Sequence, residues 1–166
     1  MNRWIGKSAV VTGASSGIGE AIAKSLTIAG MNVFGLARRE NRLDELSKSL
    51  REAKGYDFYF SILGLQTSYF YRDINLYSPS KHALHAMNAT LRDEVTGKKE
   101  NIRVTGIYPG MVKTEIVKHS GHGSEVYNIL PYIKSEQIAD CVLFALSAPP
   151  GTQVNQIVIT PLHQKM

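Results

Sequence analysis

The order of apolar and polar positions along the 166 residues predicts strands and helices in alternation. Residues 9–11 form a short apolar run that ends at a glycine-rich turn, a pattern typical of a buried parallel strand. In the stretch 18–29, Ile22, Leu26 and Ala29 recur at helical spacing, and Gly30 ends the pattern. The chain is therefore expected to begin with a strand followed by a helix.

The same alternation continues to the end of the chain. The apolar spacing predicts further strands at 32–37, 56–63, 102–108 and 156–160, and further helices at 43–50, 79–95 and 135–148. Ser135 is expected to cap the last helix, and 111–134 is expected to be irregular and flexible. Strands that alternate with helices predict an α/β domain around a largely parallel sheet.

Composition adds that the chain is globular and forms a single domain over 1–166. Hydrophobic residues make up 43% and charged residues 20%, a balance that argues against disorder. No run approaches the ~20 apolar residues of a membrane span, and the N-terminus lacks a signal-peptide core, so we expect a soluble, cytoplasmic protein. Cys141 is the only cysteine, and His119 and His122 lack further ligands, so neither a disulfide nor a metal site is expected.

The net charge of +5 allows a nucleic acid, a membrane surface or a phosphorylated small ligand as partner. The basic residues form only short clusters, at Arg38, Arg39 and Arg42 and at Lys98 and Lys99. Neither an aromatic-interleaved RNA-binding motif nor a zinc-finger spacing accompanies them. The pattern therefore disfavours nucleic-acid binding and is typical of a solvated surface.

The glycine-rich turn at 12–19, T-G-A-S-S-G-I-G, lies between the first predicted strand and the first predicted helix. Glycines let the backbone turn tightly and approach a pyrophosphate, and the helix N-terminus offers free N–H groups. The placement, more than the string of residues, predicts a dinucleotide site. The alternative is an ordinary glycine-rich connection without a ligand.

The end of the second predicted strand decides which dinucleotide is expected. A carboxylate there hydrogen-bonds the ribose of NAD, whereas arginine accommodates the 2′-phosphate of NADP. This chain has Arg38 and Arg39 there, with no carboxylate before Glu40. Arg38 is placed to meet a phosphate with a fork of donors, assisted by Arg39 or Arg42, and NADP(H) is the expected cofactor. The alternative is a pair of surface arginines at the start of a helix.

Tyr77 and Lys81 are four residues apart in the segment Y-S-P-S-K, which places both on one face of a helix. A phenol with an ordinary pKa of ~10 is a poor acid–base group at neutral pH, and a nearby ammonium favours its charged form. Such a pair supplies a general acid for carbonyl reduction or a base for alcohol oxidation. The spacing alone is weak evidence for such a site, but it is stronger evidence downstream of a glycine-rich dinucleotide turn.

These segments together resemble the short-chain dehydrogenase/reductase family, in its NADP-preferring, farnesol dehydrogenase-like branch. TGASSGIG, SILG, YSPSKHA and YPGMVKTEI occur in family order. The resemblance implies a Rossmann-like three-layer α/β/α fold with a mostly parallel sheet. It implies that Ser61 orients the substrate oxygen, that Tyr77 exchanges the proton and that Lys81 lowers the tyrosine pKa and binds the ribose. The implied cofactor-binding residues are Gly13, Ser15, Ser16, Gly17, Ile18, Gly19, Arg38, Arg39, Tyr77, Lys81, Pro109, Gly110, Val112 and Thr114.

The chain departs from the family by an internal deletion of about 80 residues, located between Arg51 and Ser61. The family's Asn-Asn-Ala-Gly strand end and its catalytic asparagine have no counterpart here. The missing strand belongs between the first strand and the one that carries Ser61. Strand 56–63 must therefore slide inward, leave a gap, or pair beside strand 32–37. We expect an intact glycine-rich half, an intact Tyr/Lys half and a compromised junction between them.

Two functions follow as hypotheses. The first is an oxidoreductase that transfers hydride between NADP(H) and a lipophilic alcohol or carbonyl substrate, farnesol-like or steroid-like. The second is a catalytically inactive truncated isoform, or an incomplete gene model, with weak or no cofactor binding. The resemblance also implies dimers or tetramers built on two long helices, one of which is missing here, so the deletion argues against assembly.

Overall fold

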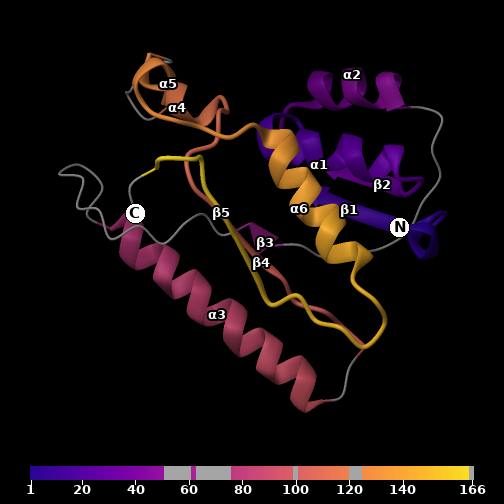
Figure 1. Cartoon of the computed structure of the whole chain (residues 1–166). Coiled ribbons are helices and arrows are strands. Elements are labelled where there is room, and N and C mark those ends of the chain that lie inside the picture. Colours follow the sequence, from indigo (N-terminus) through magenta and orange to yellow (C-terminus); the bar gives the residue numbers. More distant parts are fainter. Residues whose placement is uncertain (51–60, 63–75, 99–100, 120–124, 165–166) are drawn as a thin grey trace.

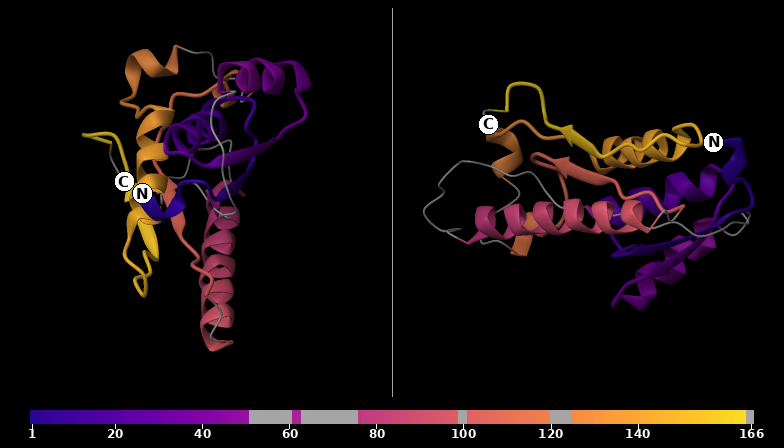
Figure 2. Two further views of the ribbon diagram at one scale, coloured as in Figure 1. Left: turned by 90° about the vertical axis from the view of Figure 1, so that its right-hand side faces the viewer. Right: turned by 90° about the horizontal axis from the view of Figure 1, so that it is seen from below.

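The computed structural model describes residues 1–50, 61–62, 76–98, 101–119 and 125–164. The strands are β1 (Ser8–Thr12), β2 (Asn32–Leu36), β3 (Ser61–Ile62), β4 (Gly106–Pro109) and β5 (Gln156–Ile159). The helices are α1 (Gly17–Ile28), α2 (Glu40–Leu50), α3 (Tyr77–Gly97), α4 (Ile116–His119), α5 (Val126–Ile129) and α6 (Ser135–Ser147), preceded by the 3-10 turn η1 (Asn2–Trp4). In Figure 1 and Figure 2, α3 and α6 lie on opposite sides of β4, as an α/β protein requires.

The predicted alternation of strands and helices is confirmed for the described residues, and several elements begin or end at other residues than predicted. The helix α3 starts at Tyr77, before Pro79, and β4 starts at Gly106 rather than at residue 102. The N-cap of α6 is Lys134 instead of Ser135, because the Gln137 side chain accepts a hydrogen bond from the Lys134 backbone N–H at 2.8 Å. Residues 56–60 and 63 of the predicted third strand lie outside the described residues.

The expectation of an irregular segment at 111–134 is wrong for the residues described there. They contain α4 and α5, and a parallel bridge pairs Val112 with Ile133. The Lys113 N–H donates to the Ile133 carbonyl at 2.9 Å, and the Ile133 N–H donates to the Met111 carbonyl at the same distance. Tertiary pairing of two short segments thus supplies the order that apolar periodicity did not reveal.

The described strands form two separate parallel sheets instead of one. One sheet has the order β1-β2, with Val10 opposite Phe34, and the other has the order β3-β4-β5. In the second sheet, Gly106 stands opposite both Ser61 and Gln156. Among the described strands, no pairing joins β1 to β3, and the expected compromised junction stays a prediction because most of strand 56–63 lies outside the described residues. The described part of the third strand, β3, pairs with β4 and not with β2, which was one of the options considered.

A single apolar core nevertheless spans both sheets, because α1 packs against α6. Figure 1 shows α6 lying alongside α1. The fully buried residues Leu26 of α1, Ile107 of β4 and Ile138 of α6 belong to this one cluster. The Trp4 indole N–H adds a hydrogen bond to the Leu146 carbonyl at 2.7 Å, which ties the N-terminus to the last turn of α6. Among the described elements, helix packing therefore joins the two sheets.

The opposite face of the β1-β2 sheet carries exposed apolar side chains. Ala9 and Val11 point into the core, so the alternation of a strand places Val10 on the other face, where it is 36% exposed. Phe34 and Leu36 of β2 are 56% and 55% exposed on that face. A mostly parallel sheet is ordinarily covered on both faces, and the described elements leave part of this face without a covering layer. No helix in the described ranges is long and apolar enough to cross a membrane.

The packing of α6 on α1 yields a prediction about stability. Replacing the fully buried Ile138 with alanine is expected to lower the free energy of unfolding by about 2–5 kcal/mol, because it leaves a cavity between the helices. Phe144 lies on the same helix but is 63% exposed, so Phe144→Ala is expected to cost less than about 0.5 kcal/mol. Urea unfolding followed by Trp4 fluorescence checks both values. Equal losses in the two variants would contradict the described core.

Candidate functional site

The glycine-rich turn connects β1 to α1 through two residues with positive φ, Gly13 at +69° and Gly17 at +56°. The Gly13 N–H donates to the Leu36 carbonyl at 2.7 Å, which holds the turn against the end of β2. A Cβ atom at Gly19 would stand 2.3 Å from the Gly13 carbonyl oxygen, so only glycine allows this approach of α1 to the turn. The residue between Gly17 and Gly19, Ile18, packs against the core.

Two serine hydroxyls at the start of α1 face the arginines that follow β2. Ser16 is the N-cap of α1, but its side chain makes no capping hydrogen bond. Its Oγ instead accepts a short hydrogen bond from Arg39 Nη2, and the buried Ser15 Oγ accepts one from Arg39 Nε at 3.2 Å. The Arg39 guanidinium therefore lies across the glycine-rich turn.

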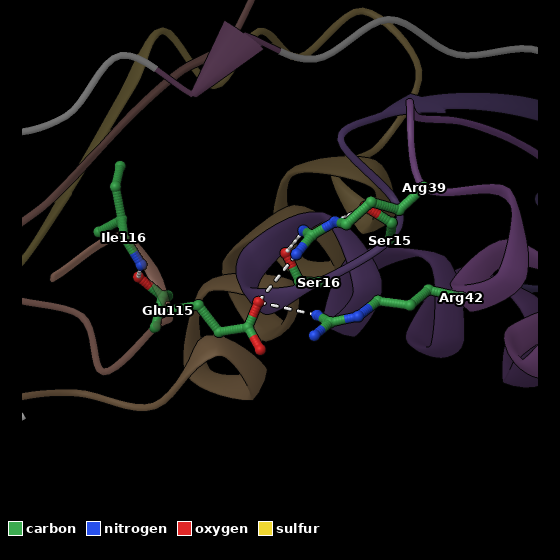
Figure 3. A network of polar contacts seen from close by, with 7 residues as sticks. Ser15, Ser16, Arg39, Arg42, Glu115 and Ile116 are labelled. Atoms are coloured by element: carbon green, nitrogen blue, oxygen red, sulfur yellow. Dashed lines mark hydrogen bonds and ion pairs between the residues drawn. The ribbon is translucent and has the colours of Figure 1, made fainter. Parts of the chain in front are cut away.

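The carboxylate of Glu115 completes a polar network with these groups, shown in Figure 3. Glu115 Oε2 accepts from Arg39 Nη1 at 3.0 Å and from Arg42 Nη1 at 2.7 Å. Hydrogen bonds from Arg42 and then Arg39 lower the pKa of Glu115 to about 2. Arg38, the arginine expected to meet a phosphate first, is exposed and has no hydrogen bond or ion pair within the described part of the chain. Arg39 and Arg42, which were expected only to assist, make the contacts.

The segment after β4 lies against the glycine-rich turn. A Cβ atom at Gly17 would stand 3.2 Å from Thr114 Cγ2, so the two segments are in van der Waals contact. The Tyr127 hydroxyl of α5 fixes this segment. It accepts from the Thr114 N–H at 3.1 Å and lies 3.2 Å from the Val112 carbonyl. The structure thus brings residues 13–19 and 112–115 together across the gap between the sheets.

The residues at the carboxyl end of β4 are held by the C-terminal segment. Pro109 is buried, and the Gly110 N–H donates to the Ile159 carbonyl of β5 at 2.8 Å. The Gln164 side-chain oxygen accepts from the Met111 N–H at 3.0 Å, and it lies where a Cβ of Gly110 would be. The segment in which the family resemblance implies cofactor-binding residues is therefore held in place by β5 and by Gln164.

Tyr77 and Lys81 lie together at the start of α3. The Lys81 ammonium is 5.3 Å from the centre of the Tyr77 ring, so it lies over the ring face. The expectation that Lys81 lowers the tyrosine pKa is not met. Partial burial of the Tyr77 phenol raises its pKa above the ordinary 10.0, since burial disfavours the charged form. Burial therefore favours the protonated form of the Tyr77 phenol.

The register of β3 separates Ser61 from Tyr77. Ser61 stands opposite Gly106, three residues before Pro109, which at ~3.3 Å per residue places its backbone about 10 Å short of the carboxyl end of β4. The ring of His85, eight residues into α3 from Tyr77, lies 5.3 Å from the Tyr108 ring centre, so Tyr77 itself lies beyond the end of β4. The Ser61 side chain lies outside the described atoms. The backbone alone does not bring Ser61 to the tyrosine.

The residues that sequence reasoning missed are Glu115, Tyr127 and Gln164. Glu115 carried one usable signal, since it is the only carboxylate between Glu100 and Glu125 and follows Thr114 of the recognised segment. Tyr127 and Gln164 carried none, because their contacts depend on the folding of 111–134 and of the C-terminus.

Comparison with known proteins identifies the family. The short chain dehydrogenase family model matches residues 7–66 and 60–125. Farnesol dehydrogenase of Aedes aegypti is 29% identical over 252 positions, covering 99% of this chain and 100% of the relative. Dehydrogenase/reductase SDR family member 11 of Mus musculus is 24% identical over 253 positions, covering 99% of this chain and 97% of the relative.

Solved structures show the same architecture. The closed form of serine dehydrogenase complexed with NADP+ has a TM-score of 0.80 at 18% identity, covering 96% of each chain. L-sorbose reductase of Gluconobacter frateurii, complexed with NADPH and L-sorbose, has a TM-score of 0.70 at 20% identity, covering 96% of this chain and 97% of the other. The fold and the glycine-rich turn define a Rossmann-type α/β protein. Within that class, the chain belongs to the short-chain dehydrogenase family.

The alignments also agree with the expected deletion. The mosquito relative aligns over 252 positions, whereas this chain has 166 residues, so more than 80 positions of the relative have no counterpart. The two family matches overlap at 60–66, which places the interruption close to the predicted one between Arg51 and Ser61.

The close approach at Gly19 yields a second prediction. Gly19→Ala is expected to destabilise the chain by about 1–3 kcal/mol, because the new methyl group would have to push the Gly13 carbonyl aside. Gly97→Ala is a matched control at the end of α3, where a Cβ meets nothing within 4 Å, and it is expected to be neutral or stabilising by up to about 1 kcal/mol. Thermal unfolding of both variants checks the comparison. Similar stability of the two variants would contradict the turn as described.

The lowered pKa of Glu115 yields a third prediction. A carboxyl whose pKa falls from 4.5 to about 2 on folding stabilises the fold above pH 4.5, and this contribution is lost as the pH falls through about 2. Wild type is therefore expected to be more stable than Glu115→Gln at about pH 7, and the difference is expected to shrink by about pH 3. Urea unfolding of both proteins across this range checks it. A difference that does not change with pH would rule out the ion pairs as its cause.

Proposed function

We propose that the chain is an NADP(H)-dependent oxidoreductase of short-chain type that acts on a lipophilic alcohol or carbonyl substrate. The observation that carries the proposal is the meeting of the glycine-rich turn with the segment after β4, around a cluster of arginines and serines that holds an anion. In this proposal residues 1–166 act as one nucleotide-binding domain.

The described residues fit a phosphorylated dinucleotide. The turn is open to close approach because its glycines adopt positive φ. Beside it, Arg39 and Arg42 donate to the Glu115 carboxylate, and Arg39 also donates to the hydroxyls of Ser15 and Ser16, so the cluster holds an anion next to the turn. In the proposal, these residues and Arg38 hold the 2′-phosphate, and Gly13 to Gly19 lie along the pyrophosphate. Pro109, Gly110, Val112 and Thr114 would border the nicotinamide.

Tyr77 is the proposed proton donor. NADPH, when bound, supplies the hydride for reduction of a carbonyl. The proton that completes the alcohol comes from the Tyr77 hydroxyl, which remains protonated at neutral pH because burial raises its pKa. Lys81 over the ring would bind the ribose and keep the tyrosine in place.

The lipophilic substrate class is supported by similarity alone. The relative from Aedes aegypti that aligns along its whole length is a farnesol dehydrogenase, and isoprenoid alcohols and aldehydes are lipophilic. Sequence identity of 29% supports a class of substrate more than a particular one. A panel of isoprenoid, steroid and small polar carbonyl compounds separates these classes.

A second candidate, cofactor binding without turnover, is supported by the position of Ser61. Its backbone lies at the amino end of β4, whereas Tyr77 lies beyond the carboxyl end. A substrate oxygen must lie within about 3 Å of both hydroxyls for the two to act together. On this candidate the chain binds NADPH at the turn and turns over no substrate.

The two candidates differ in what Tyr77→Phe does. If the chain is an enzyme, this variant is expected to lower kcat for NADPH-dependent carbonyl reduction by about 10²- to 10⁴-fold, because it removes the proton donor. Lys81→Met is also expected to lower kcat, whereas Lys98→Met, at the far end of the same helix, is expected to leave it unchanged. NADPH oxidation at 340 nm measures the rates, and NADPH fluorescence measures binding.

The outcomes of these measurements distinguish the active enzyme from a chain that binds NADPH without turnover. NADPH binding with no turnover of any substrate in the panel supports the binding candidate. Turnover that survives Tyr77→Phe unchanged overturns the assignment of the proton donor. Absence of NADPH binding by the wild-type chain overturns the proposed function altogether.

A further inference from the structure

The cluster beside the glycine-rich turn binds an anion that belongs to the chain itself. A single oxygen of Glu115 accepts from two guanidinium groups, at 3.0 Å from Arg39 and 2.7 Å from Arg42. The same Arg39 group also donates to Ser15 and Ser16. Two arginines thus converge on the Glu115 carboxylate, and the Arg39 guanidinium links it to the hydroxyls of the glycine-rich turn (Figure 3).

The donors in this cluster exceed what one carboxylate uses. Two guanidinium groups carry two positive charges and ten N–H donors, of which Glu115 takes two through one oxygen. A phosphate monoester has about −1.5 to −2 charges and three acceptor oxygens, so it matches this donor set better than a carboxylate does.

The cluster is accessible to a ligand from solution. The Arg39, Arg42 and Glu115 side chains are 43%, 39% and 35% exposed. Exposed ion pairs of this kind are weak and exchange readily. The backbone behind Glu115 is anchored at Thr114 by Tyr127, and the following residue, Ile116, is 72% exposed. Glu115 can therefore leave the arginines without disturbing the core.

We propose that Glu115 is the chain's own occupant of a phosphate-monoester site formed by Arg39, Arg42, Ser15 and Ser16, and that it sets the preference for a phosphorylated cofactor. Its identification with the 2′-phosphate of NADP(H) rests on the function proposed above. A dinucleotide with this phosphate displaces Glu115 and takes over both arginines. A dinucleotide without it leaves the ion pairs in place and gains nothing from the arginines.

The displacement also links cofactor binding to the segment after β4. Glu115 is the only described carboxylate that pairs with Arg39 or Arg42, so its release removes the ion pairs between this segment and α2. The contact of Thr114 with Gly17 then remains as the direct link to the turn. Phosphate binding is therefore expected to increase amide hydrogen exchange at 115–117 while Thr114 stays protected.

The test compares Glu115→Gln with Glu94→Gln in the full chain. Glu94 is a matched control, because it is also an exposed, ion-paired glutamate but pairs with Lys98 on α3. Calorimetry measures the affinity of each protein for adenosine 2′,5′-bisphosphate and for adenosine 5′-monophosphate. Glu115→Gln is expected to bind the bisphosphate about three- to tenfold more tightly than wild type, with the monophosphate unchanged. Glu94→Gln is expected to match wild type with both nucleotides.

Thermal unfolding in inorganic phosphate provides a readout that does not depend on the dinucleotide. Phosphate is expected to raise the melting temperature of Glu115→Gln more than that of wild type. Adding Arg39→Gln to the Glu115→Gln variant is expected to remove this additional rise in melting temperature. Equal affinity of wild type and Glu115→Gln for the bisphosphate overturns the inference while the proposed function stands. If no variant binds either nucleotide but phosphate still selectively stabilises Glu115→Gln, the proposed function fails and the phosphate site stands. Absence of both effects overturns the inference.

Discussion

The contact between α1 and α6 is the interaction on which the rest of this structure depends. In a doubly wound protein, hydrogen bonds across one continuous sheet hold the two halves in register. Here the sheet is divided into β1-β2 and β3-β4-β5, and no pairing joins the two among the described strands. Leu26, Ile138 and Val142 are fully buried in the core that α1 and α6 share. Apolar packing, which is non-directional, tolerates a gap that hydrogen-bonded strands would not.

The site follows from this contact. Val112 and Ile133 belong to the same core as Leu26, so the segment after β4 is anchored on the surface that carries α1. The amino end of α1 carries the glycine-rich turn, and Gly17 therefore meets Thr114. Elements separated by almost 100 positions in the sequence thus form one side of the proposed nucleotide site. The deletion affects the proposed substrate side of the site, where β3 leaves the Ser61 backbone at the amino end of β4.

The local features of the fold could be predicted from the sequence, because they depend on neighbouring residues. The spacing of Ile22 and Leu26 indicates α1, and the spacing of Tyr77 and Lys81 places them on one helical face. The glycine-rich turn could be predicted because it lies between a strand and a helix. Features that depend on distant pairing could not be predicted. The register of Ser61, the bridge from Val112 to Ile133 and the ion pairs of Glu115 each join segments whose approach no local pattern encodes.

Native-state hydrogen exchange of the full chain tests most directly whether α1 and α6 make one cooperative unit of the two sheets. If they do, the amides of β1 and β4 open with the same free energy, within about 1 kcal/mol, because both require global unfolding. A β1-β2 sheet that opens at a free energy about 2 kcal/mol or more below that of β4 would show two independent halves. That result would contradict a single core and the nucleotide site built across it.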